Sequence, residues 1–111
     1  MKVKKAFNTT TTAVTTTVDL QADNYPHCTE IQAYVKHNQT GGTKGVKIYG
    51  RLHPNLSFVL LNNITNTNET DGTPAGTGKW YTLTPCPSYR FEINNAGGGS
   101  MTAAAYLMGH N

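Results

Sequence analysis

The chain has 111 residues, 37% of them hydrophobic and 14% charged, which fits one domain with a modest core. Its six Tyr, three Phe and single Trp exclude a typical disordered composition, which is poor in aromatic residues. The net charge of +3 forms no basic stripe, and no apolar run reaches the roughly 18 residues of a membrane-spanning helix, so neither a nucleic-acid partner nor a membrane is expected.

The first 20 residues predict an extended N-terminal arm that leads into a first edge strand. They begin with the basic residues Lys2, Lys4 and Lys5. A threonine-rich stretch follows, NTTTTAVTTTVDL, with Val14 and Val18 among its few apolar residues. Threonine favours extended backbone, and so few apolar residues should add little to a core. Because no apolar stretch follows the basic start, a cleaved secretion signal is not expected.

The middle of the chain contains two clearly alternating segments. Residues 28–37 place Ile31 and Val35 on one face and polar residues on the other, and residues 46–51 alternate in the same way around Ile48. A period of two is typical of a half-buried strand. The turn sequence NQTGG between the two segments predicts that they form a hairpin.

The second half of the chain predicts four more strands. Residues 56–61 form an almost wholly apolar run, and the polar residues 62–79 after it predict a long loop. Strands are expected at residues 80–84, 89–93 and 101–108, the last after the glycine-rich turn NNAGGGS. About seven short strands without a helix predict an all-β fold, an antiparallel β-sandwich with jelly-roll topology as one option.

We expect residues 21–111 to form this single sandwich domain. Its core should contain the residues in the apolar phase of the clearest strands: Ile31, Val35, Ile48, Phe91 and Ile93.

The sequence predicts no catalytic centre, no metal site and no cofactor. The four histidines lack metal-ligand spacing, and the glycine run 97–99 opens no helix, as a phosphate-binding loop would require. Asn66, Asn68, Glu69 and Asp71 supply oxygen atoms that could hold calcium, but their spacing matches no calcium motif and favours a solvated loop. We therefore expect a binding protein rather than an enzyme.

Cys28 and Cys86 are the two cysteines of the chain. Cys28 opens an early predicted strand and Cys86 lies at the corner before a late one, so the two could meet at one end of a sandwich. Without a secretion signal, reduced thiols are the default and a disulfide is the alternative.

From Tyr25 onward the chain is similar to small β-sandwich proteins that are common among the structural proteins of tailed bacteriophages. The corresponding pieces are TEIQAYVKH, GVKIYGRL, KWYTL, SYRFEI, NNAGGGS and MTAAAYLMG. The resemblance implies a virion component made in the host cytoplasm. The best fit is a capsid decoration (cement) protein that binds the major capsid protein lattice and stabilises the head. Many carbohydrate-binding modules share the same pattern.

The resemblance also implies a homotrimer whose copies sit across junctions between capsid subunits. In that role the N-terminal arm would add a strand to a sheet of a neighbouring protein, and its contacts would come from Lys2, Lys4, Lys5, Val14 and Val18. The alternative is a loose N-terminus followed by an ordinary first strand. The alanine-rich closing strand and its apolar end predict an oligomer interface at Ala103, Ala105, Tyr106 and Met108.

The alternative function is a tail or fibre accessory protein, or a carbohydrate-binding module, that recognises a host-surface glycan. Trp80 beside the asparagine-rich loop, with Asn66, Asn68 and Asp71, would supply the aromatic ring and the polar partners of such a site. The simpler interpretation places Trp80 in the core at one end of the sandwich.

Overall fold

The computed structural model describes residues 2–22, 30–39, 43–65 and 78–110, and in these ranges the chain forms strands and no helix. In chain order the strands are β1 (Lys2–Thr11), β2 (Thr15–Gln21), β3 (Glu30–His37), β4 (Gly45–Arg51), β5 (Val59–Thr65), β6 (Lys79–Leu83), β7 (Ser88–Asn94) and β8 (Met101–His110). The predicted all-β class is confirmed.

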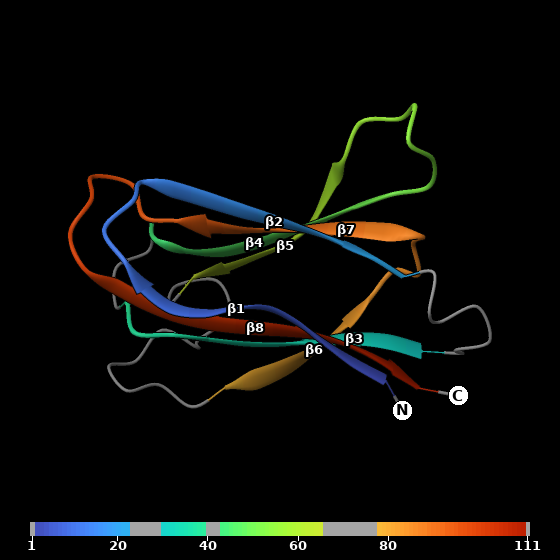
Figure 1. Cartoon of the computed structure of the whole chain (residues 1–111), viewed down its shortest axis with the longest axis horizontal. Helices are drawn as coiled ribbons and strands as arrows, with labels where there is room; N and C mark the ends of the chain where they lie inside the picture. Colours follow the sequence, from blue (N-terminus) through green and yellow to red (C-terminus); the bar gives the residue numbers. More distant parts are fainter. Residues whose placement is uncertain (1, 23–29, 40–42, 66–77, 111) are drawn as a thin grey trace.

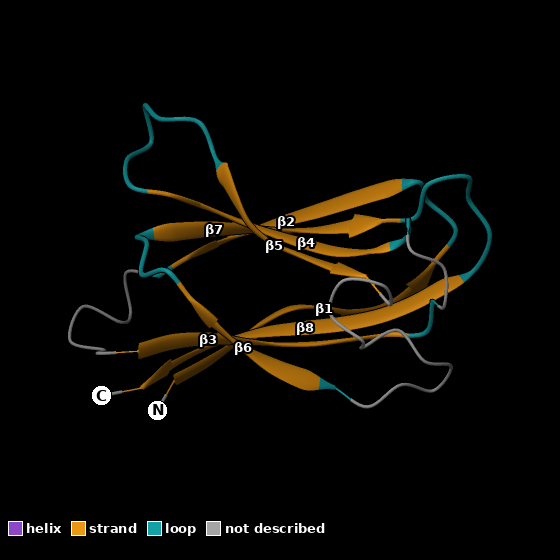
Figure 2. Cartoon of the chain, turned by 180° about the vertical axis from the view of Figure 1, so that it is seen from behind, coloured by secondary structure: helices purple, strands orange, loops and turns teal. Residues whose placement is uncertain are grey.

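The strands form two four-stranded antiparallel sheets that lie face to face (Figure 1 and Figure 2). We name them sheet A, with the order β1-β8-β3-β6, and sheet B, with the order β2-β7-β4-β5. The first strand pairs with the last, the second with the seventh, the third with the sixth and the fourth with the fifth. One long hairpin rolled up on itself has this pairing, which is jelly-roll topology. The β-sandwich prediction is confirmed, and the jelly-roll option is the one that the chain adopts.

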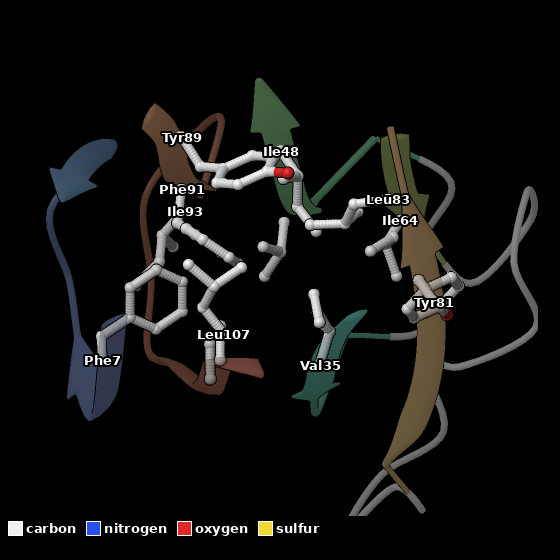
Figure 3. Close-up of a cluster of buried hydrophobic side chains, with 14 of the residues drawn as sticks. Phe7, Val35, Ile48, Ile64, Tyr81, Leu83, Tyr89, Phe91, Ile93 and Leu107 are labelled. Carbon is white, nitrogen blue, oxygen red and sulfur yellow. The ribbon is translucent and has the colours of Figure 1, made fainter. Parts of the chain in front are cut away.

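The core lies between the two sheets, because alternate residues of each strand point inward. Figure 3 shows Val35 and Leu107 of sheet A and Ile48 and Phe91 of sheet B pointing into the same space. The five residues predicted for the core are all buried: Ile31, Val35, Ile48, Phe91 and Ile93. The alternating strand phase therefore identified the inner faces correctly.

The N-terminal segment forms two edge strands, where its composition predicts an extended arm that leads into one edge strand. Residues 2–11 form β1, which pairs with β8, and residues 15–21 form β2, which pairs with β7. Both are edge strands, one in each sheet. The expectation that this segment adds little to the core is wrong at Phe7, which is only 6% exposed and belongs to the core cluster. Sheet pairing uses backbone groups, so a threonine-rich strand can pair as fully as an apolar one.

The expected hairpin between residues 28–37 and 46–51 is also wrong, because β3 and β4 belong to different sheets. Instead β4 forms a hairpin with β5, which begins at Val59 rather than at Leu56. Side-chain alternation reveals which face of a strand is buried. It does not reveal which strand lies beside it.

Two loops meet at one end of the sandwich, which we call the closed end, and Asn95 holds them together. Its buried side chain donates hydrogen bonds to the carbonyl oxygens of Ala13 (3.2 Å) and Gly99 (2.8 Å). Its backbone N–H donates to the carbonyl oxygen of Val14 (2.8 Å). The turn that follows requires its glycines 97–99, whose φ angles of 87°, 77° and 89° lie in the left-handed region.

Candidate functional site

The opposite end of the sandwich carries an apolar hairpin formed by the end of β4, residues 52–58 and the start of β5, which projects beyond the other strands (Figure 1). Four large apolar side chains are exposed there: Leu52 (68%), Leu56 (52%), Val59 (63%) and Leu60 (48%). We call these four residues the hairpin surface. Single exposed apolar residues are ordinary, but a group of them on one protruding element marks an interaction surface.

Local contacts hold the hairpin in a defined shape. The backbone N–H of Leu56 donates to the carbonyl oxygen of His53 at 2.9 Å and closes the turn. Phe58 lies against the guanidinium groups of Arg51 and Arg90, each 4.4 Å from the ring centroid, in cation–π contacts. The apolar side chains are thus displayed on a structured turn.

Arg90 is fixed from its other side by Asp19 of β2. Its Nε and Nη2 donate to the two carboxylate oxygens at 2.8 and 3.0 Å. The hydrogen bond from Arg90 lowers the pKa of Asp19, so the carboxylate stays ionised at neutral pH. An exposed ion pair adds little stability, but this one links β2 to β7 and holds the Arg90 guanidinium in place over the ring of Phe58.

An apolar groove of about 490 Å³ lies beside the hairpin surface. Its lining includes Leu52, Leu56, Val59, Leu61, Thr84 and Cys86. Gly50 allows β4 to approach the thiol closely, because a Cβ at this position would come within 2.6 Å of Cys86 Sγ. Burial raises the pKa of the Cys86 thiol, so the groove wall presents a neutral group at physiological pH.

Tyr89 locks the loop that forms one wall of this groove. Its hydroxyl donates to the carbonyl oxygen of Thr84 (2.7 Å) and accepts the backbone N–H of Cys86 (2.9 Å). Burial raises the pKa of Tyr89 to about 12. Sequence reasoning placed Tyr89 only in an alternating strand, because nothing local indicates that its hydroxyl reaches back to the preceding corner.

Sheet A presents three aromatic side chains on its outer face. Tyr34 of β3 pairs directly with Trp80 of β6 and with Tyr106 of β8, and their ring centroids lie 5.0 and 6.3 Å from that of Tyr34. We call these three residues the aromatic row. Trp80 is 49% exposed, so its interpretation as a core residue is wrong. The next residue, Tyr81, is the one that points inward and is buried.

The residues predicted for an oligomer interface on the last strand face two ways. Ala103 and Ala105 point into the core and are fully buried, so the prediction that they contact another copy is wrong. Tyr106 and Met108 occupy the opposite face, where Met108 is covered and pairs with Val3 of β1. The strand period of two separates the four residues, since β8 is an inner strand whose alternate side chains fill the core.

The N-terminal residues predicted to bind a partner do not form one surface. Lys4 donates from Nζ to the last backbone carbonyl of β2 at 2.5 Å, while Lys2 and Lys5 belong to β1, with Lys5 exposed on the outer face of sheet A. Val14 is 54% exposed between β1 and β2, at the closed end. Val18 packs against the core.

Several predicted site residues lie outside the described residues: Asn66, Asn68, Glu69, Asp71 and Cys28. The calcium and loop hypotheses therefore stay predictions. Cys86 carries a free thiol. Within the described ranges no three His, Cys, Asp or Glu side chains gather closely enough to hold a metal ion. The same ranges contain no helix long and apolar enough to cross a membrane.

No protein-family model, curated protein or solved structure matches this chain, so an inference about its function rests on its own surfaces.

Proposed function

We propose that this chain is a non-enzymatic structural protein that attaches to another protein through the hairpin surface. The setting that we propose is a virion, with the chain as a capsid decoration protein. The grouping of Leu52, Leu56, Val59 and Leu60 on a structured, protruding hairpin carries the proposal. Covering exposed apolar area stabilises a complex by about 25 cal/mol per Å² before the costs of association. A partner that covers these side chains would therefore be held mainly by them.

Strand β5 adds a second feature of a protein-binding surface. It is the outer strand of sheet B, and one of its backbone edges has no strand partner in the described part of the chain. A free edge can accept a strand from another protein. The other edge of sheet B is β2, whose exposed side chains are all polar: Thr15, Thr17, Asp19 and Gln21. The apolar start of β5 makes it the edge that a protein partner would contact.

The virion setting rests on the fold and on the expectation from the strand pattern. Jelly rolls occur among viral capsid domains, and the strand pattern of the sequence led us to expect a structural protein of a tailed bacteriophage. One fold serves many functions, so the hairpin surface and not the topology is the basis of the proposal. In this setting the partner is the major capsid protein lattice, the location is the capsid surface, and attachment stabilises the head.

The proposed attachment surface replaces the N-terminal arm expected from the sequence. Residues 2–21 supply one edge strand to each sheet, and Phe7 adds to the core. Deleting this segment would unfold the domain instead of testing its binding. The homotrimer stays a prediction, and its contacts would have to use exposed groups in place of Ala103 and Ala105.

Co-sedimentation with purified capsids that lack this protein, from the virus that encodes it, tests the proposal. The double variant Leu56→Ser/Val59→Ser should bind at least about tenfold more weakly, because two central apolar contacts are lost. Val14→Ser is the matched control, since Val14 is equally exposed but lies at the closed end. It should bind like the unmodified chain.

All three proteins should first show the same thermal midpoint, so that binding and folding are separated. Undiminished capsid binding by the double variant would remove the proposed role of the hairpin. Loss of binding in Val14→Ser alone would return attachment to the N-terminal segment.

A further inference from the structure

The aromatic row lies on a face that the capsid proposal does not use. Tyr106, Tyr34 and Trp80 are direct cross-strand partners, so their side chains stand side by side across β8, β3 and β6. Their inward-facing neighbours fill the core, including Ala33, Ala105 and Tyr81. The row therefore lies outside the core: Trp80 is exposed, whereas Tyr34 and Tyr106 are partly buried and Gly78 lies against the ring of Tyr34.

Hydrogen-bonding side chains border the row on both sides. In the neighbouring register position on one side, Gln32 and Thr82 pair across β3 and β6. On the other side lies a shallow hollow of about 300 Å³, whose lining includes Asn8, Lys36 and Thr102. A ligand lying along the row would meet amide, hydroxyl and ammonium groups on its flanks.

The hollow and the row are joined by a hydrogen bond. The side-chain Nδ2 of Asn8 donates to the hydroxyl of Tyr106 at 3.5 Å. Small Ala104 pairs with both Asn8 and Lys36, which leaves the space between these longer side chains open. The two features therefore form one continuous surface across sheet A.

The charge of this face has one sign near the row. Lys5 pairs with Tyr106 at one end, and Lys36 lies two residues along β3 from Tyr34. The strands of sheet A contain one carboxylate, Glu30, at the far end of β3. It is four residues from Tyr34, or roughly 13 Å at the rise of an extended strand. Within the described strands of sheet A, an anionic ligand on the row would meet two ammonium groups and no close carboxylate.

We infer that the aromatic row and its polar borders form a binding site for an anionic polysaccharide. The apolar faces of sugar rings stack on aromatic side chains, their hydroxyls pair with the bordering amides and hydroxyls, and their acidic groups pair with Lys5 and Lys36. The ring planes are inclined by 60° and 56° to their neighbours, so they make no flat platform. This inclination favours a single flexible chain over a crystalline surface.

Two competing roles for the aromatic row would give different results in the same experiment. Cross-strand aromatic pairs stabilise sheets by themselves, and in that case the row has no ligand. Single-stranded nucleic acid also stacks on aromatic rings, but its binding sites track the backbone with a longer basic groove than two lysines provide.

The chain has a single tryptophan, Trp80, so its fluorescence reports directly on this site. Titration with polygalacturonate should change the emission of Trp80 saturably, and fully methyl-esterified pectin, its uncharged counterpart, should bind at least about tenfold more weakly. Lys36→Gln should weaken binding several-fold, whereas the matched charge control Lys47→Gln, on sheet B, should not.

Retardation in native gels that contain polygalacturonate extends the test to variants that lack the fluorophore. Trp80→Ala should bind at least about tenfold more weakly, the effect of losing one aromatic contact. Tyr49→Phe, on sheet B and outside the aromatic row, should bind normally.

Absence of any change with polygalacturonate would overturn the inference. So would equal weakening by Lys36→Gln and Lys47→Gln, since that indicates non-specific charge attraction. Tighter binding of oligothymidylate would assign the row to nucleic acid instead. A Trp80→Ala protein that loses stability but keeps its gel retardation would assign the row to the sheet alone. The hairpin surface belongs to sheet B, so the capsid proposal can fail without affecting this result.

Discussion

The two ends of the sandwich differ in what covers them. At the closed end, a buried polar side chain, Asn95, satisfies the backbone of two loops, and a turn of three glycines passes over it. At the other end, the hairpin leaves Leu52, Leu56 and Val59 in solvent. Substitution of the buried Asn95 should therefore reduce stability, and substitutions on the hairpin surface should reduce binding.

Among these substitutions, Asn95→Ala at the closed end should cause the largest decrease in the free energy of unfolding. The change removes the side-chain donor of the carbonyl oxygens of Ala13 and Gly99, which should lower the free energy of unfolding by about 1 to 3 kcal/mol. Urea denaturation measures it. The adjacent Asn94→Ala is the control, because its bond to the carbonyl of Thr43 is exposed and should contribute less than about 1 kcal/mol. Equal decreases in the free energy of unfolding for the two variants would mean that the buried hydrogen bonds of Asn95 do not specifically stabilise this end.

Tyr89→Phe should lower the free energy of unfolding by about 2 kcal/mol. It removes the acceptor of the Cys86 N–H and the donor to Thr84 beneath the hairpin groove. Tyr49→Phe is the comparison, since its hydroxyl makes one long bond of 3.4 Å to Glu92 at the surface, and we expect less than about 0.5 kcal/mol. If Tyr89→Phe left the free energy of unfolding unchanged, the two hydrogen bonds of the Tyr89 hydroxyl would not stabilise the loop beneath the hairpin.

Stability should also depend on pH through His37, which is buried at the closed end. Burial lowers its pKa in the folded state below the ordinary 6.5. Below about pH 6.5 the unfolded chain binds a proton at His37 that the folded chain does not bind. The free energy of unfolding should therefore decrease as the pH is lowered, by at most about 1.4 kcal/mol per pH unit. Above that pH this contribution is constant.

Denaturation curves between pH 5 and pH 8 measure this dependence. His37→Gln should reduce the slope, whereas His53→Gln, in the exposed hairpin turn, should leave it intact. If the free energy of unfolding of His37→Gln kept the same dependence on pH, that dependence would be assigned to other histidines.

The smallest effect on folding should come from the hairpin surface itself. Leu56→Ser should change the free energy of unfolding by less than about 0.5 kcal/mol, because its side chain is half exposed and fills no core space. The half-buried Leu61, which packs against the core, is the contrast, and Leu61→Ser should cost clearly more. A large decrease in the free energy of unfolding for Leu56→Ser would mean that the hairpin stabilises the fold. In that case the exposed apolar side chains would not indicate a binding partner.

The alternating segments were predictable because a strand turns successive side chains to opposite faces. Ile31, Val35 and Ile48 could be assigned to the core without knowing what lay opposite them. The same rule applied to the segment around Phe91. The two-sheet sandwich followed, since several half-apolar strands have no other way to cover their inner faces.

The candidate surfaces were less accessible from the sequence. Trp80 was named from the sequence, but Tyr34 and Tyr106 are 46 and 26 residues away from it along the chain and meet it only through β3. The apolar run that includes Leu56 resembles a buried strand, and only its place in a protruding hairpin exposes it. Lateral strand order decides both, and no local pattern records that order.

The sequence by itself determined the positions and inner faces of the clearly alternating strands and the all-β class, because these depend on local periodicity. Tertiary structure alone decided that Phe7 joins the core, that Asn95 reaches two loops, and that Ala103 faces inward instead of toward another copy. Each of these depends on pairing between segments far apart in the chain, above all β1 with β8. Backbone hydrogen bonds make such pairing possible for almost any side chains, so the residues themselves carry little trace of it.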